Sequence, residues 1–354
     1  MLLVDKQRPK TLEEMDYHKD MSINLMKLAS SNEFPHMLFY GPSGCGKKTR
    51  IMALLREMFG SGVEKLRMEK REFKTPSQKS IEIVTIASNY HIELNPSDVG
   101  IYDYVVVQEI IKEIAQYKQL DANAKHPFKV VLLSEADNLS RNAQAGLRRT
   151  MEKYSSNCRL ILCCENSSRI IAPIRSRCLC LRISAPTLSE VLSILQRNCL
   201  NEGLSVPSSQ LQRIAQASNR NLRRALLLLE SNTAANGGGG LKGEDIVLMD
   251  WERFLESIVG IIVTKQNPAA LLEIRGKYYE LLARLIPASV ILKRIASRLV
   301  DSTPSRATQM EIVHWAAVYD QKMRKGGKEI VPLEAFTARC MALLAQARHS
   351  CIVF

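Results

Sequence analysis

Short apolar runs alternate with helical patterns in the first half of the chain. Three runs of strand length predict buried strands at 37–40, 129–133 and 159–164. Apolar residues spaced three and four apart predict amphipathic helices at 105–120 and 142–154. Because strands that alternate with helices form parallel sheets covered by helices, this half is predicted to be an α/β domain.

The second half of the chain has helical patterns and few strand patterns. Helices of a small bundle are predicted at three places: 191–199, 208–217 and 221–229. A glycine run at 236–240 predicts a flexible linker, and a further helical segment begins at Asp250. We therefore expect three domains, which are an α/β domain (1–185), a small helical bundle (186–240) and an all-helical C-terminal domain (241–354).

Composition and charge narrow the class of protein. The 354 residues are 46% hydrophobic and 24% charged, which is typical of a globular protein and excludes a disordered or collagenous chain. The 49 Lys and Arg exceed the 36 Asp and Glu and give a net charge of +13, which favours a polyanionic partner. No apolar run approaches the roughly 20 residues of a membrane helix. We expect an intracellular protein without a membrane span or secretory signal.

The cysteines do not indicate a disulfide framework or a zinc site. Their number, nine, is odd, and several lie in apolar stretches such as 160–164. No Cys-x-x-Cys pair is present. Reduced, mostly buried thiols are the expected state, and no resident metal ion is predicted.

A glycine-rich segment follows the strand at 37–40 directly and leads into a helical pattern at 51–58. Its residues are Gly41, Pro42, Ser43, Gly44, Cys45, Gly46, Lys47, Lys48 and Thr49. This Gly-x4-Gly-Lys pattern between strand and helix is typical of a phosphate-binding loop. Backbone N–H groups and the helix N-terminus would bind phosphates, and Lys47 would reach the β and γ oxygens. A glycine turn before a helix, the alternative, does not require Lys47 in this register.

Two departures weaken the magnesium site of this loop. Lys48 stands where a Ser or Thr hydroxyl should ligate Mg²⁺, and Thr49 comes one residue too late. After the second predicted strand, Ser134 stands where a metal-binding Asp is needed, although Glu135 could still polarise a water molecule. We therefore predict bound ATP or ADP, weak or absent Mg²⁺ and poor hydrolysis. Alternatively, Glu135 and Asp137 are solvated residues that cap the following helix.

Motifs over nearly the whole chain resemble those of the small subunits of eukaryotic replication factor C, the clamp loader of the AAA+ class. They are the segments 4–12, 41–49, 134–137, 147–152, 176–178 and 221–225. The Gly-Lys-Lys-Thr loop and Ser134 are similar in particular to the small subunit whose own ATP site is degenerate. The resemblance implies a AAA+ domain, a helical lid (186–240) and a C-terminal collar (241–354) that joins the subunits.

The resemblance also implies roles for residues around the nucleotide. Four would surround the adenine and ribose: Val4, Arg8, Pro9 and Asp16. Arg223 would be the second sensor, an arginine of the lid that reaches the phosphates; its alternative role is a surface residue on an amphipathic helix. Leu3 and Gln7 replace the aromatic residues usual in the family. The first sensor falls on Glu165, with Asn166 as the alternative.

Arg177, in the segment 176–178, matches the arginine finger of the family. Such a residue would act in trans, on the γ-phosphate held by a neighbouring subunit. A guanidinium suits this role because it stays charged and can donate two parallel hydrogen bonds to phosphate oxygens. The alternative is an ordinary arginine in a surface turn.

Contacts with DNA and with the sliding clamp are implied less specifically. The candidates for phosphate contacts are Lys112, Arg141 and Arg148, on helices that face the central chamber in the family. A solvated helix face explains each of them equally well. The candidates for clamp contact are Ile114, Tyr117 and Leu120, for which packing in the core is the alternative.

The preferred hypothesis is a subunit of the ATP-dependent loader that places the clamp on primer-template DNA in replication and repair. It would bind nucleotide, hydrolyse it poorly and assist a neighbour. Its partners would be other replication factor C subunits, the sliding clamp and DNA, in the nucleus. The alternatives are a self-sufficient AAA+ DNA-dependent ATPase and a non-catalytic scaffold with a vestigial loop.

Overall fold

The computed structural model describes residues 1–31, 34–74, 80–116, 128–155, 157–235, 249–325 and 327–352. The chain divides into two compact units, residues 1–246 and 247–354. The linker predicted at 236–240 and the domain boundary predicted at 240/241 lie outside the described residues. The boundary predicted at 185/186 falls within the first unit and stays a prediction.

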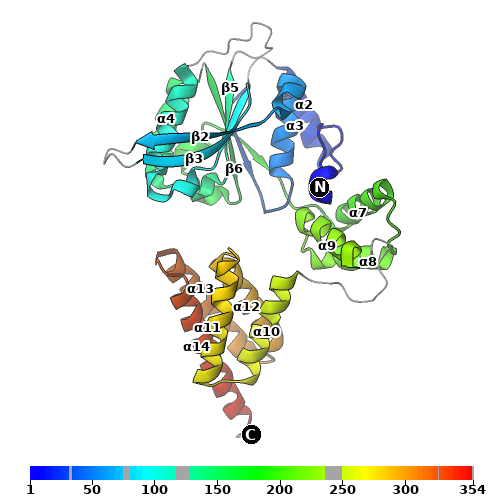
Figure 1. Cartoon of the computed structure of the whole chain (residues 1–354), viewed down its shortest axis with the longest axis vertical. Coiled ribbons are helices and arrows are strands. Elements are labelled where there is room, and N and C mark those ends of the chain that lie inside the picture. The colour runs from blue at the N-terminus through cyan, green and yellow to red at the C-terminus, as the bar shows by residue number, and fades with distance from the viewer. Residues whose placement is uncertain are drawn as a thin grey trace. The chain divides into compact units, whose positions relative to one another are not determined.

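One sheet with the strand order β2-β3-β4-β5-β6-β1-β7 forms the centre of the first unit (Figure 1). Its parallel strands are β4 (His91–Leu94), β5 (Lys129–Leu133), β6 (Cys158–Cys164), β1 (Met37–Tyr40) and β7 (Leu179–Arg182). The three predicted strands are confirmed as β1, β5 and β6, at the centre of this parallel sheet. An unpredicted antiparallel pair, β2 (Arg67–Lys74) and β3 (Ser80–Ala87), extends the β4 edge.

Helices cover both faces of the sheet. They are α2 (Lys19–Ser30), α3 (Lys47–Phe59), α4 (Asp103–Gln116) and α5 (Arg141–Lys153). Alternate residues of a strand point to opposite faces. Leu38 therefore packs in one core with α4 and α5, whereas Met37 and Phe39 pack in the other with α2 and α3. Figure 1 shows α4 on one side of the sheet and α2 and α3 on the other.

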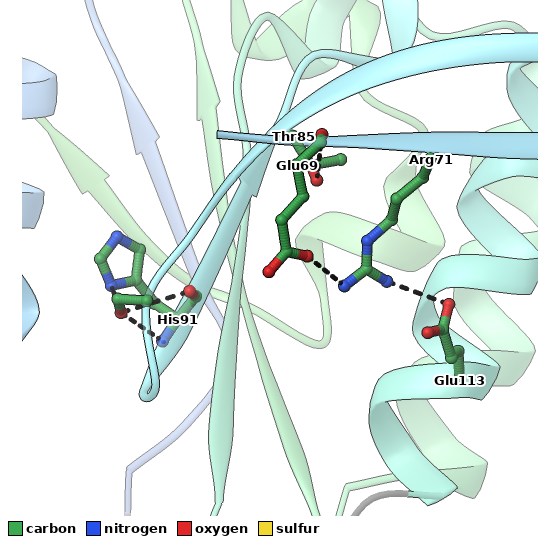
Figure 2. Close-up of polar contacts among 6 residues, drawn as sticks. Glu69, Arg71, Thr85, His91 and Glu113 are labelled. Atoms are coloured by element: carbon green, nitrogen blue, oxygen red, sulfur yellow. Dashed lines mark hydrogen bonds and ion pairs between the residues drawn. The ribbon is translucent and has the colours of Figure 1, made fainter. Parts of the chain in front are cut away.

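Short elements connect this framework. They are α1 (Leu3–Lys6), η1 (Gly60–Glu64), η2 (Pro96–Tyr102), η3 (Ala136–Asn138), η4 (Ser167–Arg169) and α6 (Ala172–Arg175). An ion-pair chain joins the antiparallel pair to α4: the Arg71 guanidinium lies 3.0 Å from a carboxylate oxygen of Glu69 and 3.0 Å from one of Glu113 (Figure 2). Arg71 thus fixes the added strands against the helix layer.

Three further helices complete the first unit: α7 (Leu188–Glu202), α8 (Ser208–Ala217) and α9 (Leu222–Ala235). A capping box between Thr187 and Glu190 begins α7, and Gly203, in the left-handed region at φ 67°, ends it. The backbone N–H of Leu3 in α1 donates to the Glu230 carboxylate of α9 at 3.1 Å. The N-terminal segment is therefore held against the small helical bundle.

The second unit consists of helices in the described residues. They are α10 (Asp250–Thr264), α11 (Pro268–Ala283), α12 (Ala288–Ser302), α13 (Arg306–Lys325) and α14 (Ile330–Ile352). Pro268 occupies the first turn of α11, where its missing N–H costs no hydrogen bond. Buried aliphatic and aromatic side chains from all five helices form one core. This unit matches the predicted all-helical C-terminal domain in fold class.

Helix α14 is long and apolar enough, by length and composition, to cross a membrane. The window is Ile330–Ala347, with a mean hydropathy of 1.2. The apolar-run criterion did not single it out, because its apolar residues are interrupted by polar ones. Leu333, Phe336 and Cys340 are fully buried against the other helices of the unit. We interpret α14 as a core helix, for which such composition is common.

Tyr278 provides a test of packing in the second unit. Its side chain is fully buried, and its hydroxyl lies 2.7 Å from that of Thr337, which in turn donates to the Leu333 carbonyl oxygen at 2.9 Å. Tyr278→Phe leaves a buried hydroxyl without its donor, so the free energy of unfolding should fall by about 1 kcal/mol in urea denaturation. Tyr279→Phe, at the exposed neighbouring position, should change nothing. Equal stabilities of the two variants would contradict a stabilising hydrogen bond between Tyr278 and Thr337.

Candidate nucleotide-binding site

The glycine-rich loop joins β1 to α3, in the strand–loop–helix order that the sequence predicts. Gly46 lies in the left-handed region, with φ 79°, and α3 begins at the next residue. The Lys47 ammonium group donates to the Gly41 carbonyl oxygen at 2.6 Å and to that of Pro42 at 2.8 Å. The Lys47 side chain therefore folds back onto the loop. Its ammonium group lies at the amino end of the helix, where phosphate oxygens bind best.

Gly44 brings the loop into direct contact with the start of α9. A Cβ atom at this position would lie 1.8 Å from Oδ1 of Asn221. The Leu222 N–H donates to the Gly44 carbonyl oxygen at 3.2 Å, and Asn221 accepts a bond from the Arg224 N–H at 3.1 Å. The phosphate-binding loop and the helical bundle are thus joined by a main-chain hydrogen bond and by the Asn221 side chain, which leaves no room for a side chain at Gly44.

Gly46 brings the same loop against Tyr17. A Cβ atom there would lie 2.4 Å from the Tyr17 hydroxyl oxygen. This hydroxyl donates to the Cys45 carbonyl oxygen at 2.6 Å, and burial raises the pKa of Tyr17 to about 12. Arg50, itself fully buried, donates to the Tyr17 carbonyl oxygen at 2.5 Å and stacks 5.0 Å from the ring centre. The Tyr17 ring is therefore fixed beside the loop.

A cavity lies between the N-terminal segment, the phosphate-binding loop and the helical bundle. Its lining includes eight of the predicted residues: Val4, Arg8, Pro9, Asp16, Gly44, Gly46, Thr49 and Arg223. Other predicted loop residues do not line it, and these are Gly41, Pro42, Ser43, Cys45, Lys47 and Lys48.

Residues that the sequence did not predict complete the cavity. They are Gln7, Met15, Tyr17, Ile194, Arg197, Asn198, Leu222 and Leu226. Tyr17 supplies an aromatic wall, although the sequence positions usual for aromatic residues hold Leu3 and Gln7. The sequence did not identify Tyr17 as a site residue, because a lone aromatic residue before a helix is commonly part of the core.

Ion pairs fasten the N-terminal segment to α7 across this cavity. Asp16, predicted near the nucleotide, pairs with Arg197 of α7. The Glu202 carboxylate accepts hydrogen bonds from Lys6 and Gln7, each at 2.6 Å, and these bonds lower its pKa. The closed cavity therefore depends on contacts between residues about 180 to 200 positions apart.

Lys48 and Ser134, the two residues that replace magnesium ligands, meet at one carboxylate. The Lys48 ammonium lies 2.6 Å from Oε1 of Glu93, and the Ser134 hydroxyl donates to the same oxygen at 3.1 Å. Glu93 is only 9% exposed. In the described residues, no group of three or more His, Cys, Asp or Glu could hold a metal ion. The residues present do not fit Mg²⁺, because an ammonium group already occupies the carboxylate.

The remaining acidic and sensor positions lie at strand ends. Glu135 is exposed, has φ 51° and accepts a bond from the Asn138 side-chain amide at 3.1 Å, but its side chain makes no capping hydrogen bond to the start of η3. The Asn166 side chain accepts bonds from Ser168 at 3.0 and 2.8 Å and so caps η4. Glu165 is exposed. The choice between Glu165 and Asn166 as first sensor stays a prediction.

Arg177 follows α6 and is held by Glu152 of α5. Its Nε lies 2.7 Å from the Glu152 carboxylate, and its Nη1 donates to the Pro173 carbonyl oxygen at 2.8 Å. Gln144 of α5 accepts a bond from the Ile171 N–H at 2.9 Å and fixes the turn that carries Arg177. Arg177 does not line the cavity of its own chain, and its guanidinium is paired with Glu152.

Several exposed cations lie on α4 and α5. The three predicted DNA-contact residues, all exposed, are Lys112, Arg141 and Arg148. Lys112 lines a groove together with two unpredicted cations, Arg149 and Lys153, whereas Arg141 and Arg148 do not line it. This clustering is compatible with both phosphate contacts and a solvated helix face.

The predicted clamp-contact residues receive only partial description. Ile114 is 3% exposed and packs in the core with α5 and the sheet. A direct clamp contact by Ile114 is therefore wrong, because its surface is already buried. Tyr117 and Leu120 lie outside the described residues.

Comparisons with known proteins agree on one family. Family models match at residues 251–348 (replication factor C subunit 3, C-terminal domain), 17–187 (DNA polymerase III, delta subunit) and 193–234 (RCF1/5-like, AAA+ ATPase lid domain). Replication factor C subunit 3 of Homo sapiens is 49% identical, over 97% of this chain and 96% of that protein. Replication factor C subunit 5 of Neurospora crassa is 47% identical, over 97% of both.

Solved structures of the Holliday junction branch migration motor RuvB of Thermotoga maritima also match. One has a TM-score of 0.49 and 16% identity and covers 72% of this chain and 80% of that one.

The α/β domain with its phosphate-binding loop, the lid and the C-terminal helices define a AAA+ clamp-loader subunit. The cavity is bounded by the loop and by lid helices within the matched segment 193–234. The chain belongs to the replication factor C subunit 3/5 family. The family resemblance and the fold class expected from the sequence are confirmed.

The contact between Gly44 and the lid can be tested with a matched glycine. Gly44→Ala should weaken binding of a fluorescent ADP by about tenfold or more, because the new methyl group displaces Asn221 and opens the cavity. Gly203 has a similar φ, 67° against 72°, but open space at its Cβ position. Gly203→Ala therefore carries the strain of a left-handed residue, about 1 to 2 kcal/mol, without the collision. Equal affinities of both variants would refute the role of this contact.

Proposed function

We propose that this clamp-loader subunit binds ATP or ADP, hydrolyses it poorly and supplies Arg177 to the nucleotide site of a neighbouring subunit. The observation that carries the weak hydrolysis is the contact of Lys48 and Ser134 with Glu93. Both residues stand where AAA+ and other P-loop enzymes hold Mg²⁺. Lys48 cannot supply the hydroxyl that ligates the metal ion, and Ser134 cannot supply the carboxylate.

Nucleotide binding is supported by the cavity and its charges. The loop supplies backbone N–H groups, and Arg223 of the lid lines the cavity. Lys47 is already turned toward the loop, where its ammonium bonds to main-chain oxygens. A polyphosphate would exchange those weak acceptors for charged ones, which bind an ammonium about twice as strongly. Val4, Arg8, Pro9 and Tyr17 would enclose the base and sugar.

The role of Arg177 in trans is supported by its position and by Glu152. A guanidinium held by a carboxylate keeps one orientation, which is the preorganisation that a residue acting on a distant phosphate needs. Glu152 is therefore a positioning residue in this proposal. The resulting subunit assists hydrolysis by a neighbour while its own site retains nucleotide.

We further propose the assembly that this function requires. The chain would join other replication factor C subunits in a hetero-oligomer through its C-terminal helices, and would act with the sliding clamp and primer-template DNA in the nucleus. The net charge of +13 and the exposed Lys112, Arg141 and Arg148 support contacts with DNA phosphates. Such contacts follow the backbone and do not read bases.

Poor hydrolysis is tested on the isolated full-length chain. Phosphate release from ATP in the presence of Mg²⁺ should stay far below the median enzyme turnover of about 10 per second, because two metal ligands are replaced. A turnover near that median would support a self-sufficient ATPase and refute the proposal.

The arginine finger is tested in the complete complex of subunits. Arg177→Ala should remove the finger from one neighbouring site, where such residues are worth about 10³ to 10⁵ in rate, and so lower total DNA-stimulated hydrolysis. Nucleotide retained by this chain should not change. Arg175→Ala, at an exposed position two residues earlier, is the control. Equal hydrolysis by both variants would rule out the proposed role.

A further inference from the structure

The replaced magnesium site contains its own cation. We propose that the Lys48 ammonium group, anchored by Glu93 and Ser134, takes the place of Mg²⁺, so that this subunit binds ADP or ATP without any divalent metal ion. The inference rests on the proposed nucleotide binding and adds a defined cofactor requirement to it.

The geometry places all three groups at one point. Lys48 is the second residue of α3, directly after the phosphate-binding lysine, and Ser134 follows the end of β5. Both contact Oε1 of Glu93, at 2.6 and 3.1 Å. Glu93 reaches this point because β4 pairs in parallel with β5, and the Ser134 N–H donates to the Leu94 carbonyl oxygen at 3.0 Å. The metal-binding positions are therefore adjacent, as in an active site, but an internal ion pair connects them.

Burial makes this ion pair a permanent feature. The Glu93 side chain is 11% exposed, and every residue of β4 is buried. A buried carboxylate without a cationic partner is costly, so the pair should persist whether or not nucleotide is bound. His91, two residues earlier on the same strand, bonds to Ser88 through Nδ1 at 2.7 Å (Figure 2). Burial lowers the pKa of His91, so the imidazole is neutral near pH 7 and Lys48 is the cation that balances Glu93.

The Lys48 side chain is still 45% exposed. An ammonium group has three N–H donors, of which Glu93 accepts one, so it can also donate to phosphate oxygens. Mg²⁺ instead demands about six oxygen ligands in near-octahedral geometry. To enter this site, it would have to separate Lys48 from Glu93 and then lie beside a fixed positive charge. The geometry thus favours the internal cation over the metal.

The metal requirement is measured with the full-length chain and fluorescent ADP, titrated in magnesium chloride and in excess chelator. The wild-type affinity should agree within about twofold between the two buffers, well under the tenfold that 1.4 kcal/mol represents. An affinity that falls tenfold or more in chelator would overturn the inference. Absence of binding in both buffers would instead refute the proposed nucleotide binding.

Lys48→Thr should make ADP binding depend on a divalent metal ion. It restores a hydroxyl at the ligand position and frees the Glu93 carboxylate for a metal ion. Its affinity should fall by about tenfold in chelator, the loss of one charge-assisted hydrogen bond, and should recover when magnesium is added. Lys65→Thr, at an exposed position outside the site, is the matched control and should behave as wild type in both buffers. Equal affinity of Lys48→Thr in both buffers would contradict the inference.

Counting the bound metal ions directly distinguishes a change in the metal requirement from a general loss of ADP affinity. Mn²⁺ replaces Mg²⁺, and electron paramagnetic resonance counts the ions held by each ADP complex. The ADP complex of wild type should hold no Mn²⁺, whereas that of Lys48→Thr should hold one ion. The double variant Lys48→Thr/Glu93→Gln should lose that ion again, because the only carboxylate in the cluster is neutralised. A tightly held ion in wild type would refute the proposal.

Discussion

The close contact of the glycine-rich loop with its neighbours is the constraint on which the site depends. Gly44 leaves no space for a side chain against Asn221 of the lid, and Gly46 leaves none against Tyr17. One loop of a few residues therefore determines where two separate segments approach the end of β1. The cavity bounded by these segments therefore requires glycine at both positions.

Charged residues around this junction have a different effect on each side. Toward the lid, Asp16 pairs with Arg197 and holds the cavity together. Toward the sheet, Lys48 pairs with Glu93 and occupies a place that hydrolytic relatives of the fold reserve for a metal ion. In the proposed function, the same loop would hold a nucleotide without cleaving it. Such a division of roles would suit a subunit whose Arg177 acts on a neighbour, as we propose.

The parts of the fold that the sequence predicted are those with continuous apolar patterns. The strands β1, β5 and β6 are buried on both faces, so they appear as unbroken apolar runs. The strand β2 was missed because it lies at the edge of the sheet, and charged residues such as Arg67, Lys70 and Arg71 fill it. The neighbouring run at 80–87 carries β-branched residues, a signal that could have identified β3. The strand β4 was missed although all its residues are buried, because Glu93 interrupts its apolar pattern.

The sequence by itself determined the chemistry that depends on local spacing. It placed Lys47 after the glycines, showed that Lys48 is no metal ligand and marked Arg177 in its short motif. Only the tertiary structure decided which partners these residues have: Glu93 beside Lys48, 45 positions away, and Glu152 beside Arg177, 25 positions away. Pairs so far apart in the chain meet through the order of strands and the packing of helices on the sheet. No local sequence pattern predicts these pairs, because nothing near Glu93 or Glu152 in the sequence distinguishes either of them from other glutamates.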